Sequence, residues 1–207
     1  MAFSGWPAQA LEFYAGLEDD NSKSYWASHK AVYEEKVLHP MTELLEQLGQ
    51  EFGEPKIFRP YRDVRFSADK TPYKTHIGAT IGGMAYVQLS ADGLSAGAGR
   101  WQLDPAQLAR YRAAVAADRT GDELEAIIAV IEKAGYEVHG HGTLKSAPRG
   151  YPPHHARIEL LRHKGLTAWQ HWKPAPWLAT ADAAHRLQSF FRTGAALSSW
   201  LGSNVNG

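Results

Sequence analysis

Basic residues are concentrated in the middle of the chain, where residues 58–76 read FRPYRDVRFSADKTPYKTH although the formal net charge of the whole sequence is zero. Between residues 56 and 76, six lysines and arginines face two aspartates, a formal excess of four positive charges. An arginine can hold two oxygens of a phosphate or carboxylate at once, and a lysine adds a mobile point charge. The segment therefore predicts a binding site for an anion.

A second basic segment, LKSAPRGYPPHHARIELLRHKG, occupies residues 144–165 and has five lysines and arginines against the single acid Glu159. Its glycine and prolines predict that its first half is a loop, where functional groups are often displayed. If the two segments fold beside each other, they form a strongly positive cleft. The alternative for the second segment is a solvated helix face, and the sequence does not decide whether the two segments are adjacent.

The candidate ligand-binding residues come from both segments. They are Arg59, Arg62, Arg65, Lys70, Tyr73, Lys74 and His76 in the first segment, and Lys145 and Arg149 in the second. We expect an anionic small molecule as the partner, because arginines buried beside aromatic rings need a compensating charge. A general acid or base would come from His76 or Asp63, but the sequence cannot position either against a substrate. Whether the protein is an enzyme therefore stays open.

Two other functions use the same residues. In a nucleic-acid-binding module the lysines and arginines contact phosphates while aromatic rings stack on nucleobases. The rings available for stacking are Tyr61, Phe66, Tyr73 and Trp101. In a structural or adaptor protein, Asp63 and Asp69 instead pair with the arginines internally. If residues 62–67 form a strand, Arg65 lies on the same face as Asp63 and can pair with it.

Other chemistries have weaker signals. Four histidines, at positions 139, 141, 154 and 155, lack the HExxH pattern or a carboxylate triad, so we expect no metal and no cofactor. The sequence GAGRWQ, residues 97–102, has Gln102 where a dinucleotide loop needs its third glycine. Ser67 has no identifiable base to activate it. The absence of cysteine excludes disulfides and thiolate nucleophiles.

The composition is that of an ordinary globular protein, with 44% hydrophobic and 21% charged residues among 207. This length predicts one domain over residues 1–207. The longest apolar run, around residues 126–131, is much shorter than a bilayer requires. The first residues lack the basic and apolar regions of a secretory signal. We therefore expect a cytoplasmic protein with no membrane partner.

Hydrophobic periodicity predicts an α+β fold in which a small antiparallel sheet is flanked by helices. Helices are expected from Pro7, from Ser22 to Phe52 with an interruption at Pro40, from Asp104, over 122–134, over 156–163 and at the carboxyl end. Strands are expected over 74–81, 84–90, 94–98, 136–139 and 167–172. The sequence SADG, residues 90–93, predicts the turn of a hairpin.

The mid-chain run IFRPYRDVRFSADKTPYKTHIGA resembles the signature of a bacterial and fungal family, domain of unknown function 2461. Three other stretches are similar to that family: NSKSYWASHKAVYEEKVLHP, YVQLSADGLSAGAGRW and the second basic segment. Tyr25 followed by Trp26 departs from the tryptophan and phenylalanine expected there. The resemblance extends over about residues 9–201 and implies no reaction, cofactor or catalytic residue. The site assignments therefore depend on the physical argument alone.

Overall fold

The structure is a computed structural model that describes residues 3–65 and 68–206. Its contacts group the chain into two compact units. The first unit contains residues 1–96 and 171–189, and the second contains residues 97–170 and 190–207. The expectation of one domain over the whole chain stays a prediction.

The predicted α+β class is confirmed, with a six-stranded antiparallel sheet in the strand order β1-β2-β3-β4-β6-β5. The strands are β1 (Pro55–Ile57), β2 (His76–Ile81), β3 (Ala85–Ser90), β4 (Gly93–Arg100), β5 (Glu137–His141) and β6 (Gly165–Trp172). The five expected strands all occur, with ends shifted by a few residues. The short strand β1 was not expected. The conditional strand over 62–67 is wrong for residues 62–65, which are irregular, and residues 66–67 lie outside the described residues.

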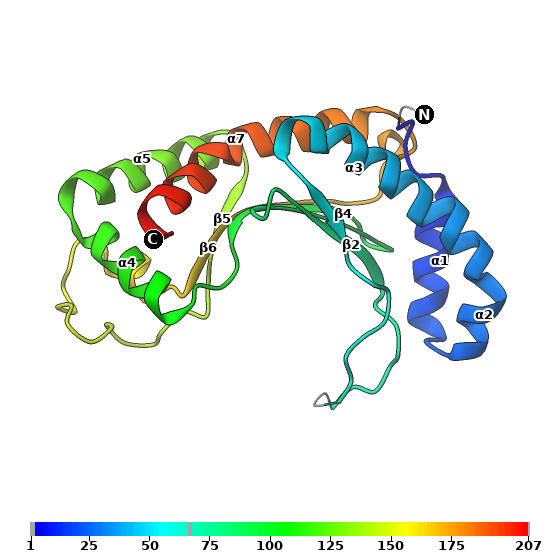
Figure 1. Cartoon of the computed structure of the whole chain (residues 1–207), viewed down its shortest axis with the longest axis horizontal. Helices are drawn as coiled ribbons and strands as arrows, with labels where there is room; N and C mark the ends of the chain where they lie inside the picture. The colour runs from blue at the N-terminus through cyan, green and yellow to red at the C-terminus, as the bar shows by residue number, and fades with distance from the viewer. Residues whose placement is uncertain (1–2, 66–67, 207) are drawn as a thin grey trace. The chain divides into compact units, whose positions relative to one another are not determined.

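The helices of the first unit are α1 (Ala8–Asp19), α2 (Lys23–Val32), the π-helical segment η1 (Tyr33–Leu38) and α3 (His39–Phe52). Figure 1 shows α1 and α2 lying side by side. Ser22 caps α2 as expected, because its hydroxyl accepts a hydrogen bond from the Tyr25 N–H over 3.1 Å. The expected interruption at Pro40 takes the form of a π-helical segment that joins α2 to α3. A wider turn accommodates a proline, which lacks an N–H and crowds the preceding turn of an α-helix.

Strand β2 separates a buried face from a partly exposed one, because successive side chains of a strand point to opposite faces. Ile77, Ala79 and Ile81 are buried, whereas His76 and Thr80 are partly exposed. In the register with β3, His76 lies opposite Ser90 and Thr80 lies opposite Tyr86. The partly exposed face of β2 and β3 is therefore the polar face of the sheet in the first unit.

The second unit contains α4 (Pro105–Ala116), α5 (Asp118–Lys133), α6 (Ile158–Arg162) and most of α7 (Asp182–Val205). The short 3₁₀ helix η2 (Pro176–Ala179) belongs to the first unit. Asp104 and Gln107 form a reciprocal capping box at the start of α4, with Pro105 in the first turn, as the sequence predicts. In the described part of the chain, no helix combines the length and apolar character needed to cross a bilayer.

Candidate anion-binding site

The first basic segment forms an extended pair of arms, here called the mid-chain loop (residues 58–75), which projects from β1 and β2 (Figure 1). Tyr61 and Tyr73 face each other in an antiparallel bridge. On either side of this bridge, the Lys74 N–H donates to the Pro60 carbonyl over 2.8 Å and the Arg62 N–H donates to the Pro72 carbonyl over 2.9 Å. Neither proline has an N–H with which to return the bond. Side chains must therefore help to hold the arms.

The side chain of Asn21, between α1 and α2, provides this support. Its amide group donates to the Tyr73 carbonyl over 3.1 Å, and its amide oxygen accepts from the Tyr73 N–H over 3.0 Å. The Tyr73 ring is stacked on Trp26 of α2, with ring centroids 4.4 Å apart and planes inclined by 6°. Tyr73, predicted as a ligand contact, is only 6% exposed. Its described contacts anchor the mid-chain loop to the helices.

Two of the predicted arginines are paired within the loop. The Arg65 guanidinium donates to both carboxylate oxygens of Asp63, over 2.9 and 2.7 Å, although residues 62–65 do not form the strand on which this pairing was predicted. These bonds are the main reason that the pKa of Asp63 is lowered. Arg62 contacts Asp69 and the Thr71 hydroxyl. A backbone hydrogen bond from Thr71, followed by the bonds from the Arg62 and Thr71 side chains, lowers the pKa of Asp69 to about 2.

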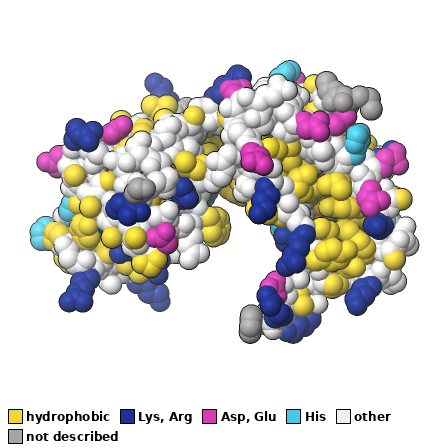
Figure 2. All heavy atoms as spheres, viewed as in Figure 1, with side chains coloured by type: hydrophobic (Ala, Val, Ile, Leu, Met, Phe, Trp, Pro, Cys, Tyr) yellow, Lys and Arg dark blue, Asp and Glu magenta, His cyan; other side chains and the backbone are white. Residues whose placement is uncertain are grey.

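The remaining cations of the loop form no ion pair with a carboxylate of the described residues, although the charge of Arg59 also contributes to the lowered pKa of Asp63. Lys70 donates to the Val64 carbonyl over 2.9 Å. Arg59 is exposed, and Lys74 lies over the Phe58 ring with its Nζ 5.4 Å from the ring centroid. Figure 2 shows lysine and arginine side chains gathered along the loop and the strands that carry it. Arg59, Lys70 and Lys74 therefore give the loop positive charge that is not neutralised by an ion pair within the described residues, unlike the charge of Arg62 and Arg65.

Arg59, Lys74 and His76 also influence one another electrostatically. Burial first, and the positive charge of Arg59 second, lower the pKa of Lys74. Burial first, and Lys74 second, lower the pKa of the half-buried His76. A like charge nearby disfavours the protonated form of a base. We call Arg59, Lys74 and His76 the cationic triad.

Uncharged groups on the polar face of β3 border the triad, and no sequence pattern selects them. The Tyr86 hydroxyl donates to the Gln88 amide oxygen over 2.7 Å, and the Phe58 and Tyr86 ring centroids are 6.3 Å apart. A Cβ at Gly78 would lie 2.7 Å from the Tyr86 hydroxyl oxygen, so glycine leaves space for that ring. Phe58 and Tyr86 could have been selected only with the strand register known.

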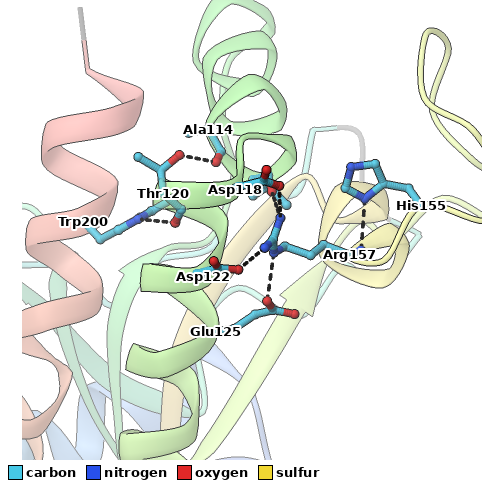
Figure 3. Close-up of polar contacts among 9 residues, drawn as sticks. Ala114, Asp118, Thr120, Asp122, Glu125, His155, Arg157 and Trp200 are labelled. Atoms are coloured by element: carbon cyan, nitrogen blue, oxygen red, sulfur yellow. Dashed lines mark hydrogen bonds and ion pairs between the residues drawn. The ribbon is translucent and has the colours of Figure 1, made fainter.

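The second basic segment belongs to the second unit, and most of its described arginines are paired. Arg157, which is 9% exposed, contacts Asp122, donates to Glu125 over 2.8 Å and lies 4.0 Å from Asp118 (Figure 3). All three acids are on α5. Arg162 donates to Glu159 over 2.9 Å and to the Leu144 carbonyl over 2.6 Å.

Lys145 and Arg149, the two residues predicted as ligand contacts in this segment, are exposed and make no hydrogen bond or ion pair with the described residues. They belong to the second unit, whereas the cationic triad belongs to the first. A cleft formed by both segments therefore stays a prediction.

The histidines do not assemble into a metal site in the described residues, where no group of three or more potential ligands can hold a metal ion. His139 contacts Glu137 over 2.7 Å, and His141 contacts the Thr167 hydroxyl over 2.7 Å. Ser67, the candidate nucleophile, lies outside the described residues, as does Phe66.

Comparison with known proteins supports the sequence resemblance. A family model described as "Conserved hypothetical protein (DUF2461)" matches residues 9–200, close to the range expected from the sequence. Neither the curated proteins nor the solved structures contain a match. Because the family model covers almost the whole length, the chain belongs to the DUF2461 family of conserved hypothetical proteins.

Proposed function

We propose that the protein binds a small phosphate- or carboxylate-bearing molecule at the cationic triad of Arg59, Lys74 and His76. The observation that carries the proposal is that the bond from the Lys74 N–H to the Pro60 carbonyl holds Lys74 beside Arg59, and that none of the three groups forms an ion pair with a carboxylate of the described residues. An anion would relieve the repulsion within the triad, because an opposite charge favours the protonated forms of Lys74 and His76. The Phe58 and Tyr86 rings and the Gln88 amide supply an apolar and hydrogen-bonding border for the rest of the ligand.

The pairing of Arg62 and Arg65 narrows the set of residues on which binding depends. Both side chains already have carboxylate partners, as an internally paired structural role requires. We therefore assign the anion to the triad and a supporting role to these two arginines. Without a ligand, the lowered pKa of His76 favours its neutral form, so His76 adds its positive charge to the triad when an anion is bound. The neutral form is compatible with base catalysis, but the proposal concerns binding only.

The nucleic-acid alternative requires exposed rings as well as cations. Tyr61 is 50% exposed and Trp101 of the second unit is 67% exposed, but Tyr73 is packed on Trp26 and is not available for stacking. A single strand that binds through four phosphates would show a slope of about −3 in log affinity against log salt, whereas one phosphate would give about −0.7. The salt dependence of binding therefore separates a small anion from a nucleic acid.

Thermal unfolding with inorganic phosphate, sulfate and citrate tests the proposal. At about one hundred times its dissociation constant, an anion adds about 2.7 kcal/mol to the free energy of unfolding. This corresponds to a rise in Tm of roughly 5 to 10 °C for a chain of this size. Lys74→Gln and Arg59→Gln should abolish the rise. The matched control is Arg65→Gln, which removes a cation of the same loop that already has a partner, and it should retain the rise.

The same assay has a pH dependence that depends on His76. An anion beside His76 raises its lowered pKa, so binding takes up a proton and sulfate affinity should increase as the pH falls from about 8 to about 6. Sulfate is the suitable probe because its charge stays constant over this range. His76→Gln should remove this increase. Equal Tm shifts in Lys74→Gln and Arg65→Gln, or no shift with any anion, would contradict the proposal.

A further inference from the structure

The second unit presents an indole ring that is more exposed than its size would suggest. Trp101, in the segment between β4 and α4, is 67% exposed and is one of three large hydrophobic side chains that are mostly exposed among the described residues. The other two are Tyr61 and Val130. A tryptophan side chain contributes a large apolar area when it is buried. An indole that stays exposed despite this gain is a candidate contact for a ligand.

Trp101 is backed by a residue of β5, which is separated from β4 in the sheet by β6. Its ring centroid lies 3.8 Å from that of His141 on β5, with the two planes inclined by 32°. His141 Nε2 is 2.7 Å from the Thr167 hydroxyl of β6, which restricts the orientation of the imidazole. Burial is the main cause that lowers the pKa of His141, so the imidazole is neutral near pH 7. One side of the indole therefore contacts a neutral ring whose position is restrained.

The backbone around Trp101 is also closely packed. A Cβ at Gly165 would lie 2.1 Å from the Trp101 carbonyl oxygen, and a Cβ at Gly99 would lie 2.5 Å from the Leu166 carbonyl oxygen. Gly99 has a φ of 126°, which favours glycine. The Leu103 N–H donates to the Lys164 carbonyl over 2.9 Å. These contacts hold the segment that carries Trp101 against β6, so little ordering is needed when a planar ligand stacks on the indole.

A cation lies beside this backing. The Lys164 N–H donates to the His141 carbonyl over 2.7 Å, and the Lys164 carbonyl accepts from Leu103, so the backbone of Lys164 bridges the two sides of the platform. The Lys164 side chain is exposed and has no hydrogen-bond or ion-pair partner in the described part of the chain. The nearby acid Asp104 is engaged in capping α4. The local chemistry therefore combines an exposed aromatic face with an available positive charge.

From these contacts we infer that Trp101, backed by His141, is a stacking platform for a nucleobase whose phosphate is bound by Lys164. Every base offers a π-face to an aromatic side chain, and the phosphate on the sugar that carries the base matches the ammonium group. The ligand is either a mononucleotide or a base within a single strand. This site is separate from the cationic triad, and its existence does not depend on the proposed function.

Fluorescence anisotropy with a labelled oligothymidylate of about eight nucleotides, in parallel with NMR titration of adenosine monophosphate, tests the inference. The Trp101 indole N–H resonance, assigned by its loss in Trp101→Phe, should shift on titration. Trp101→Ala should weaken binding about 5- to 150-fold, the range expected for loss of one stacked base. Trp101→Phe should retain most of the affinity. Lys164→Gln should weaken binding, but the Trp101 indole N–H resonance should still shift on titration. Tyr61→Ala, which removes an exposed ring of the first unit, is the matched control and should bind like the parent.

The two probes distinguish a site for a free mononucleotide from a site for a base within a single strand. Binding of both probes with dependence on Trp101 indicates a mononucleotide site, and binding of the oligothymidylate alone indicates a single-strand site. The inference is overturned if neither probe binds, if Trp101→Ala binds as tightly as Tyr61→Ala, or if neutral disaccharides shift the Trp101 resonance while the nucleotides do not. Because Trp101 is exposed, Trp101→Ala should unfold at the same temperature as the parent, and Trp101→Phe provides the comparison if it does not. Inorganic phosphate alone should leave the Trp101 resonance unshifted.

Discussion

Removal of the Asn21 side chain tests how the mid-chain loop is held. Asn21→Ala deletes two hydrogen bonds, of 3.1 and 3.0 Å, and leaves both the N–H and the carbonyl of Tyr73 without their described partner. A hydrogen bond contributes a net of about 0.5 to 1.5 kcal/mol, and a buried group left unpaired costs about 1 to 3 kcal/mol. Tyr73 is only 6% exposed. Removal of the Asn21 side chain, however, leaves a space in which water can bind the two unpaired groups of Tyr73. We therefore expect Asn21→Ala to lower the free energy of unfolding by about 1 to 3 kcal/mol.

Urea unfolding followed by circular dichroism measures the global part of this loss, and hydrogen exchange of the Tyr73 amide measures the local part. Asn21→Asp retains the acceptor for the Tyr73 N–H but places a carboxylate against the Tyr73 carbonyl, so its Tyr73 amide should stay better protected than in Asn21→Ala. Asn204→Ala is the control, because among the described residues the Asn204 amide donates only to the Trp200 carbonyl of its own helix. It should change the free energy of unfolding by less than about 0.5 kcal/mol. Equal free energies of unfolding for Asn21→Ala and Asn204→Ala, with the Tyr73 amide still protected from exchange in Asn21→Ala, would refute this role of Asn21.

Two further predictions concern the ion pairs. The pKa of Asp69 is lowered to about 2 from its ordinary value of 3.8, so its stabilising contribution is present above about pH 4 and is lost as the pH falls toward 2. An NMR titration should therefore show the mid-chain loop resonances changing over this range. Asp69→Asn should remove the change. A midpoint near pH 4 would contradict the lowered pKa of Asp69. Arg157→Met leaves the three carboxylates of α5 without their shared partner and should lower Tm, whereas Arg149→Ala should not. Equal Tm values for these two variants would show that the Arg157 cluster does not stabilise the second unit.

The sequence predicts the strands and most helices well where the local pattern and the tertiary contacts agree. The hairpin of β3 and β4 follows from alternation on both sides of the SADG turn, and α4 follows from the Asp104 cap and Pro105. The first turn of α5 was missed because Thr120 and Gly121, both weak helix formers, obscure the periodicity before Leu124. Strand β1 was missed because three residues beginning with a proline give no alternation to detect. Its pairing with β2 is a long-range contact that the local sequence does not contain.

The charge pattern shows where basic residues are concentrated along the chain, but it does not show which of them pair with acids in the folded protein. Arg65 and Asp63 are two residues apart, so their pairing was predictable from local geometry. Arg157 instead contacts acids on α5 that are more than thirty residues away in sequence. The anchoring of Tyr73 by Asn21 spans 52 residues and gives no periodic or motif signal. A count of basic residues cannot separate these cases, because pairing is a property of the folded chain.

This distinction changes which residues the anion hypothesis depends on. A basic segment attracts an anion in proportion to the charge that the protein leaves uncompensated, and Arg62 and Arg65 contribute little of it because Asp69 and Asp63 neutralise them. Arg59 and Lys74 form no ion pair with a carboxylate of the described residues, and burial first, with the charge of Arg59 second, lowers the pKa of Lys74, so holding this ammonium charged in the loop has a cost. If an anion offsets that cost, its binding should raise the pKa of Lys74 toward the ordinary value, whereas the pKa of Asp63 should stay lowered by its bonds to Arg65. We therefore propose different roles for the cations of this loop: Arg62 and Arg65 pair with its acids and shape it, whereas Arg59 and Lys74 bind the ligand.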